Sequence, residues 1–388
     1  MSRFLEYFIS PFRKNPNEVQ ALNGFRAFAI LFVILIHLFQ GIKFRYPDMS
    51  HWILNLFDNL ISTIDLFFII SGLLIYQPIK ERLDQNKSFS AKTFAINRFF
   101  RIVPCYYLVL GISYLLAKTY VVQLKQQPNL SPENLVTITE VSERLRAVWA
   151  DLFFVSNYRL GIFDVGWSLS LEVQFYVLLP FMVFLVLKHC NQQKRTLFLL
   201  GFYLLILLNL IVVYSFSLGG DLLLHETHLR FDSILAGMIL AEILDYDTNS
   251  KQGYFLLLLG ISFLALSHFL EFDSTFRKIF GTNLNNIGFG CFVFLGCKKT
   301  HFLNKIFSSS FFRPWAKISY SIYLWNVVPL GIVFGQLIKP NVNLDFWLLC
   351  KLVFFSYLVT FLFCYIFYLL VEAPSLKLRN FFVQKSKA

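Results

Sequence analysis

The stretch Leu22-Asn-Gly-Phe-Arg26-Ala-Phe-Ala-Ile-Leu-Phe-Val-Ile-Leu-Ile-His37 decides the fold class of this chain. It is apolar enough to cross a bilayer as a helix, yet it carries Arg26 and His37. Eleven residues at about 100° each make about three turns, so both side chains leave the helix on nearly one face, about 16 Å apart. Ionisable groups in hydrocarbon cost from about 2.5 kcal/mol upward and usually mark a working site. The alternative is that His37 bonds a neighbouring helix while Arg26 snorkels to the interface.

The composition of the whole chain indicates a polytopic membrane protein. Of 388 residues, 56% are hydrophobic, 47 are Phe and only 15% are charged, whereas about 25% of the residues in a globular domain are charged. The net charge of +12 comes from segments that flank the apolar runs. This follows the positive-inside rule, and no basic stripe predicts nucleic-acid binding. The six cysteines show neither metal-ligand nor disulfide spacing, so no metal site is predicted.

Hydropathy predicts an all-α transmembrane helix bundle that forms a single domain over residues 1–388. About ten spans are predicted, and an even number places both termini on one side of the membrane. They are expected to start near Leu22, Asn59, Ile102, Trp167, Leu197, Arg230, Tyr254, Asn285, Ala316 and Phe346.

The charges between the spans predict the orientation. Residues 80–101 hold six Lys or Arg against two acids, and residues 298–317 hold five against none, so both segments are predicted to be cytoplasmic. Residues 118–166 hold five charges of each sign and are predicted to form a long extracytoplasmic loop, with an amphipathic stretch at residues 145–154. The N-terminal segment 1–20 and the tail 375–388 are then cytoplasmic. The expected location is the inner (cytoplasmic) membrane, crossed many times.

Two arginines lie where the third span enters from the cytoplasmic side. Arg98 and Arg101 are three residues apart and point the same way on a helix. Two adjacent guanidinium groups can clamp phosphates through bidentate hydrogen bonds. The alternative is ordinary anchoring at the membrane surface.

The fourth span opens with polar residues at every fourth position. Ser168, Glu172 and Tyr176 therefore share one helical face. A carboxylate on that face can act as a general base or orient an imidazole. The alternative is that Glu172 pairs with Arg159 or Arg230 and holds helices together.

Further polar residues lie in or beside other predicted spans. The cost of burying a charge in lipid singles out Asp65 and the Arg230-Phe-Asp232 pair, although both can pair within the bundle. Tyr323, Trp325 and Asn326 add aromatic and polar groups near the inner end of the ninth span, where such groups commonly mark the membrane interface. Ser-His-Asp triads, phosphate-binding glycine loops and HExxH motifs are missing from the sequence.

In their order along the chain, these motifs resemble those of integral-membrane acyltransferase family 3, bacterial O-acyltransferases of cell-surface polysaccharides and other glycosides. Arg26 and His37 look like its Arg-x10-His motif, and Arg98 and Arg101 like its Arg-x-x-Arg. The further matching segments are Phe67-Phe-Ile-Ile-Ser71-Gly72, Trp167-Ser-Leu-Ser-Leu-Glu172, Ser319-Tyr-Ser-Ile-Tyr323-Leu-Trp325 and Glu372-Ala-Pro374. Asn326 departs from the family, which often has His there, so the resemblance carries no histidine role to this position.

The resemblance implies an acyl-CoA donor, usually acetyl-CoA, used from the cytoplasmic side, and an acceptor sugar hydroxyl often presented across the membrane. It implies that His37, with Arg26 and Glu172, is catalytic and that Arg98 and Arg101 bind the donor. Supporting roles are implied for Asp65, Trp167, Ser168, Tyr176, Arg230, Asp232, Tyr323, Trp325 and Asn326. Expected partners are the bilayer, acyl-CoA, a carbohydrate acceptor and proteins of envelope-polysaccharide synthesis.

Two other classes of function compete with the enzyme. A transporter or exporter of a glycan or small acid would use Arg26, His37 and Glu172 as a proton-coupled path. It would be favoured by inverted repeats or paired broken helices, and the sequence shows neither. A scaffold within an envelope-synthesis complex would leave the intramembrane charges without a purpose.

Overall fold

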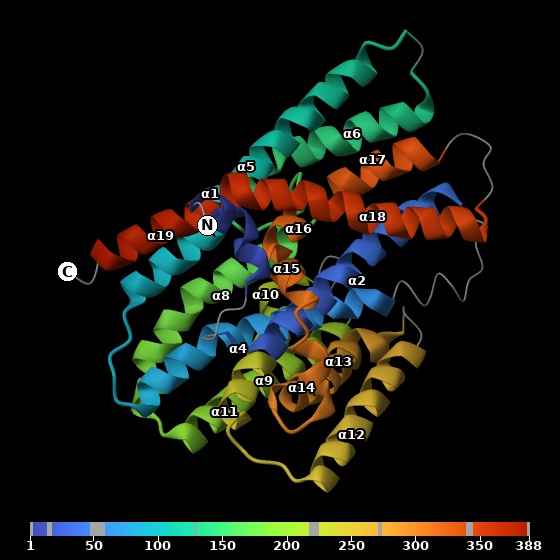
Figure 1. Ribbon diagram of the computed structural model, residues 1–388. Coiled ribbons are helices and arrows are strands. Elements are labelled where there is room, and N and C mark those ends of the chain that lie inside the picture. Colours follow the sequence, from blue (N-terminus) through green and yellow to red (C-terminus); the bar gives the residue numbers. More distant parts are fainter. Residues whose placement is uncertain are drawn as a thin grey trace. The chain divides into compact units, whose positions relative to one another are not determined.

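A computed structural model describes residues 3–13, 18–46, 59–128, 130–216, 225–270, 274–338 and 344–385. All regular elements in these ranges are helical, which confirms the predicted all-α fold class (Figure 1). The chain divides into two compact units. The first comprises Met1–Asn86, Gln192–Tyr203 and Asp232–Leu370, and the second Lys87–Asn191, Leu204–Phe231 and Val371–Ala388.

Among the described residues, eight helices are long and apolar enough to cross a membrane. They are Gln20–Arg45, Asn59–Asp84, Ala91–Lys125, Gly166–His189, Gln192–Ser215, Ser250–Phe269, Thr275–Cys297 and Phe346–Gln384. A ninth candidate span is the pair α16 (Ser319–Trp325) and α17 (Val327–Leu337), which is bent by 59°. The protein is therefore a multi-pass membrane protein.

Within the described ranges, none of these candidates corresponds to the span predicted near Arg230. Its residues form two short helices, α10 (Thr227–Arg230) and α11 (Asp232–Ile243). The 12 residues of α11 extend about 18 Å, less than the roughly 30 Å of bilayer hydrocarbon. Its apolar sequence is explained by burial instead, because most of α11 lies in the core of the first unit.

The first unit is built around α2 (Gln20–Arg45), α4 (Thr63–Asp84) and α11. Its other helices are α1 (Arg3–Ile9), α12 (Ser250–Phe269), α13 (Thr275–Cys297), α14 (Phe302–Phe307), α15 (Phe312–Lys317), α16, α17, α18 (Phe346–Phe367) and the first half of α9 (Gln192–Ser215). A Cβ atom on Gly72 would lie 2.1 Å from the Ile234 carbonyl oxygen, and one on Gly237 2.1 Å from that of Ile69. Helices α4 and α11 thus cross backbone against backbone, as small residues allow in membranes.

The second unit contains α5 (Ala91–Lys125), α6 (Pro132–Arg146), α7 (Val148–Leu152), α8 (Gly166–Leu185), α10 and α19 (Ala373–Lys385). Helix α5 begins eleven residues before the predicted start at Ile102, so Arg98 and Arg101 lie inside it. It also continues past Lys118, and the predicted loop 118–166 is largely helical. A π-helical turn, Tyr368–Glu372, precedes α19. Such a turn accommodates Pro374, which has no backbone N–H to continue the α-helical ladder.

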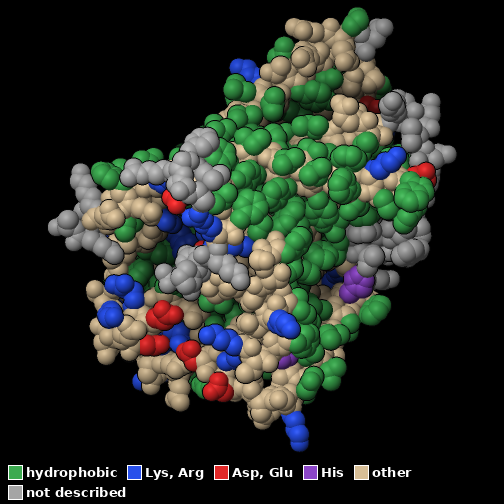
Figure 2. Space-filling view, in the orientation of Figure 1, with side chains coloured by type: hydrophobic (Ala, Val, Ile, Leu, Met, Phe, Trp, Pro, Cys, Tyr) green, Lys and Arg blue, Asp and Glu red, His purple; other side chains and the backbone are tan. Residues whose placement is uncertain are grey.

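Hydrophobic side chains are not confined to the interior of the protein. Figure 2 shows them gathered over α17 and α18, as expected for helices that face lipid. Charged side chains gather near the ends of α4 and α11 (Figure 2).

Candidate active site

The candidate site begins on α2 with Arg26 and His37. Both side chains are only partly buried, whereas Ala27 and Ile30 between them are fully buried. An Nη of Arg26 donates to Ser319 Oγ at 3.1 Å, which joins α2 to α16. His37 Nδ1 lies 3.2 Å from Gln40 Oε1, one turn further along. The structure confirms that the predicted cation and imidazole share one membrane-length helix.

The 319–326 segment supports α2 and then bends. Tyr323 packs against Phe67 of α4 with ring centroids 6.5 Å apart. Trp325 is buried against Phe367 at 5.1 Å. Asn326 is fully buried, and its Nδ2 donates to the carbonyl oxygens of Ile322 and Tyr323. These bonds occupy carbonyls at the break between α16 and α17, so Asn326 stabilises the bend.

Asp65 and Asp232 are buried in an amide-rich network of the first unit. Asp65 is 4% exposed and accepts from Asn285 Nδ2 at 3.0 Å. Asn286 Nδ2, on the next residue of α13, lies 3.3 Å from Asp232 Oδ2 and 3.2 Å from the Tyr203 hydroxyl. The alternative that these aspartates pair within the bundle is therefore observed, with asparagine as the partner.

Arg98 and Arg101 of α5 have different neighbours in the second unit. The Arg98 guanidinium lies over the ring of Tyr176 at 5.2 Å and over that of Phe94 at 5.5 Å. Arg101 donates to Glu372 Oε1 at 2.6 Å, and Glu372 is 1% exposed. Arg101 is thus engaged in a partly buried ion pair, whereas Arg98 is held by aromatic faces.

The polar face of α8 is formed in part as predicted. The Tyr176 hydroxyl donates to Glu172 Oε1 at 2.5 Å, four residues earlier. Ser168 Oγ instead donates to the Val165 carbonyl at 3.2 Å, so it closes the first turn of its own helix. Because Tyr176 also lies under Arg98, these contacts connect Glu172, Tyr176 and Arg98 in sequence.

Trp167 stacks on a histidine that the sequence analysis does not identify. The Trp167 and His225 rings are 4.1 Å apart at 30°, and Asn157 Nδ2 donates to the His225 carbonyl at 3.3 Å. Burial and the Arg230 charge lower the pKa of His225 to about 4, so the ring is neutral at pH 7. His225 lies outside the apolar runs, so a search for ionisable residues within membrane-length apolar segments does not find it.

A second group that sequence reasoning missed is a buried charge cluster in the first unit. Glu242 is fully buried and accepts from Tyr76 at 2.5 Å and from Arg195 Nε at 2.8 Å. Arg195 also pairs with Asp84, which lies 3.4 Å from Lys80. Glu242 sits in the apolar sequence of α11, so the criterion used for His37 could have found it. Because each charged group in it is paired with one of opposite sign, we interpret the cluster as structural.

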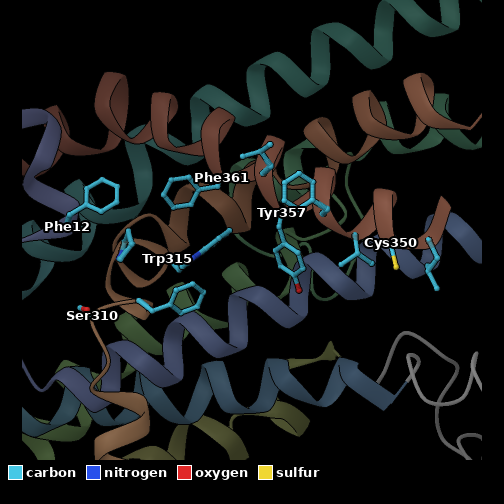
Figure 3. Close-up of a pocket in the computed structure, with 12 residues that line it drawn as sticks. Phe12, Ser310, Trp315, Cys350, Tyr357 and Phe361 are labelled. Atoms are coloured by element: carbon cyan, nitrogen blue, oxygen red, sulfur yellow. The ribbon is translucent and has the colours of Figure 1, made fainter. Parts of the chain in front are cut away.

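An apolar groove of about 980 Å³ lies along α18. Figure 3 shows Phe12, Trp315, Tyr357 and Phe361 along it. Tyr357 donates to the Leu31 carbonyl at 3.0 Å, which ties the groove wall to α2. The groove suits a hydrocarbon chain, and the candidate catalytic side chains are not among those that line it.

Comparison with known proteins gives consistent results. A sequence profile described as an acyltransferase domain matches residues 19–369. Peptidoglycan O-acetyltransferase OatA of Listeria monocytogenes is 25% identical over 361 residues, covering 85% of this chain and 52% of that protein. O-acetyltransferase OatA of Staphylococcus aureus is 24% identical over 385 residues, covering 93% and 57%. The chain thus spans about half the length of the curated relatives it matches, and no solved structure matches it.

Proposed function

Because the chain belongs to acyltransferase family 3 and is therefore an acyltransferase enzyme, we propose that it moves an acetyl group from cytoplasmic acyl-CoA to a glycan hydroxyl. The acceptor is a cell-surface polysaccharide, a lipid-linked glycan or a glycoside. The names of the relatives support this choice, since they are O-acetyltransferases and the Listeria protein is named for peptidoglycan. The enzyme acts in the inner membrane, alongside proteins of envelope-polysaccharide synthesis.

The observation that carries this proposal is the pair Arg26 and His37 on one apolar helix. Placing both groups in a membrane span costs free energy, and a helix that only spans the membrane would be more stable without them. Neither side chain belongs to the buried core of the first unit. Both therefore remain accessible to a substrate that enters along α2.

His37 has the chemistry of a general base. A hydrogen bond from Nδ1–H to Gln40 Oε1 places the basic lone pair on Nε2. That nitrogen takes the proton of the acceptor hydroxyl while the hydroxyl oxygen forms a bond to the acyl carbon. The thioester C–S bond breaks, and the departing CoA thiolate takes the proton from the imidazolium. Arg26, oriented by Ser319, lies about 16 Å from His37 along α2, so it supplies positive charge toward the anionic donor and does not contact the reacting carbonyl.

We give the two arginines of α5 different roles in binding the donor. Among the described residues, Arg98 forms no salt bridge within 4.0 Å and lies over two aromatic rings, so its charge remains available for a phosphate of CoA. Arg101 positions this segment through Glu372. Glu172 acts through Tyr176, whose ring supports Arg98.

The test is release of free CoA by purified wild-type protein and the His37→Ala variant, with acetyl-CoA and a panel of glycans. We expect release by the wild type and a loss of about 10² to 10⁴-fold in the variant, the usual contribution of a general base. His189→Ala is the matched control, because His189 is exposed in the short 3-10 helix Leu187–His189 that follows α8.

Equal elution volumes and unfolding temperatures would show that the His37→Ala protein is folded. Equal CoA release by that folded variant and the wild type would remove His37 from the mechanism. No release by wild type over a broad panel, together with glycan uptake into vesicles, would favour the transporter instead.

A further inference from the structure

A pocket of about 460 Å³ lies on the segment that charge distribution predicts to be extracytoplasmic. Its lining residues are Glu143, Arg146, Ala147, Trp149 and Arg159. We call it the loop pocket. It draws on the end of α6, the short helix α7 and the segment that follows α7. None of the roles proposed above involves these residues.

The loop pocket carries an excess of positive charge. Within the described part of the chain, neither Arg146 nor Arg159 forms a salt bridge within 4.0 Å. Their neighbour Arg144 differs, since it pairs with Asp164. Two guanidinium groups therefore face a single carboxylate, that of Glu143. This combination favours an anionic ligand that also offers hydroxyl groups to Glu143.

The frame of the loop pocket is held by hydrogen bonds on both sides. Asp151 Oδ2 accepts from the backbone N–H of Ile162 at 2.7 Å, which ties the chain just beyond Arg159 to α7. Tyr107 donates to the Leu152 carbonyl at 2.7 Å and anchors α7 to α5. A backbone held by such bonds loses little conformational freedom when a ligand binds.

Apolar side chains beside the loop pocket indicate its depth in the membrane. Trp149 is 49% exposed, Leu152 44% and Phe153 74%. Exposed Trp, Leu and Phe on a short helix flanked by arginines are typical of an element that lies in the membrane interface. The two guanidinium groups are then at the level of lipid phosphates.

We propose that the loop pocket binds the phosphate of a lipid-linked glycan, which deepens the proposed function by selecting the acceptor class and rests on it. Arg146 and Arg159 hold the phosphate oxygens through forked N–H donors. The indole of Trp149 covers the face of the adjoining sugar, and Glu143 accepts from its hydroxyl groups. The carrier chain remains in the bilayer beside Leu152 and Phe153.

The first experiment measures binding without acyl-CoA, by the full-length protein in nanodiscs of neutral phospholipid. The probe is a disaccharide linked through diphosphate to a short polyprenyl chain. For Arg146→Gln/Arg159→Gln we expect a dissociation constant at least about tenfold higher than that of wild type, the usual effect of losing charge-assisted hydrogen bonds. Lys118→Gln/Lys125→Gln removes the same charge from exposed positions of α5 and should bind as wild type does.

Equal affinity of the wild type and the arginine double variant would overturn the proposal. The free disaccharide and inorganic diphosphate separate the two parts of the ligand, and each should compete weakly. If the arginine variant binds the lipid-linked disaccharide as wild type does and retains only anionic phospholipid less well, the pocket binds an ordinary lipid headgroup and the proposal fails.

A kinetic measurement then separates this proposal from the proposed function. With a lipid-linked acceptor, the arginine variant should raise the acceptor KM and leave the acyl-CoA KM and kcat within about twofold of wild type. An unchanged acceptor KM would count against the pocket. Absence of CoA release from the wild type would reject the proposed reaction, while the binding measurement would still decide on the pocket.

Discussion

At the scale of single residues, the surroundings of a carboxyl group determine its pKa. Asp151 is fully buried, and burial raises its pKa to about 6 even though Ile162 and Phe163 donate backbone hydrogen bonds to it. The unfolded chain releases this proton near the ordinary value of about 3.9. The folded state therefore holds the proton more tightly than the unfolded state does. Its contribution to stability is present below pH 4 and is lost as the pH rises to about 6, a loss of about 3 kcal/mol.

Asp151→Asn tests this account. The amide keeps an oxygen acceptor for the Ile162 N–H but carries no charge, so we expect the variant to lack the decline in stability between pH 4 and pH 6. The measurement is the unfolding temperature in detergent as a function of pH, taken as the difference from wild type. Asp164→Asn is the control, because Asp164 is exposed and pairs with Arg144. Parallel pH curves for wild type and Asp151→Asn would contradict the assignment.

At the scale of elements, the crossing of α4 and α11 depends on two glycines. Each lacks the Cβ that would meet a carbonyl oxygen of the opposite helix at 2.1 Å. Backbone atoms cannot move aside as the end of a flexible side chain can. The Ser71-Gly72 sequence noted in the second span thus has a packing reason, and its counterpart Gly237 lies in the helix that is too short to span.

Gly237→Ala should therefore destabilise the protein although alanine favours helices. We expect a loss of about 1 to 3 kcal/mol or more, the range for overpacked cores. The measurement is the midpoint of unfolding in mixed micelles with increasing SDS. Gly201→Ala is the matched control, because a Cβ at Gly201 of α9 meets nothing within 4 Å. Equal unfolding midpoints for Gly237→Ala and Gly201→Ala would contradict this prediction, because they would show that α4 and α11 accommodate the added methyl group without loss of stability.

At the scale of the whole molecule, charge predicts how the protein lies in its membrane. The positive-inside rule places the segment around Lys87 in the cytoplasm and the turn between α5 and α6 outside. A cysteine introduced at each place can test this, against a Cys350→Ser background that lacks the most exposed native thiol and serves as the blank for the remaining native cysteines. In right-side-out vesicles, an impermeant maleimide should label Gln127→Cys, and should label Lys87→Cys only after permeabilisation. The reverse pattern would invert the predicted orientation.

The fold was predictable because lipid leaves the backbone few choices. A chain segment in hydrocarbon must satisfy its own N–H and C=O groups, so a long apolar run becomes a helix whatever its neighbours. Length was the weak point, since the apolar run after Arg230 yields only the 12 residues of α11. Whether a short apolar helix faces lipid or a protein core depends on the helices around it.

The candidate site was predictable only in part. Arg26 and His37 stand out in the sequence because charge is costly in hydrocarbon, and the same criterion applied to Glu242 would have revealed the buried cluster at α11. His225 gave no such signal, and its stacking on Trp167 depends on two segments about 58 positions apart. The loop pocket also joins positions from both sides of α7 that no periodic pattern relates.

The sequence by itself determined that this is an all-helical membrane protein and which of its helices carry ionisable groups, because backbone hydrogen bonding and the cost of burying charge act locally. Only the tertiary structure decided the partner of each group. Arg98 and Arg101 look equivalent in the sequence, yet one meets Tyr176 and the other meets Glu372, 271 positions away. The tertiary structure decides these partners because an ion pair forms only where packing brings distant segments together, and a local sequence pattern does not specify that packing.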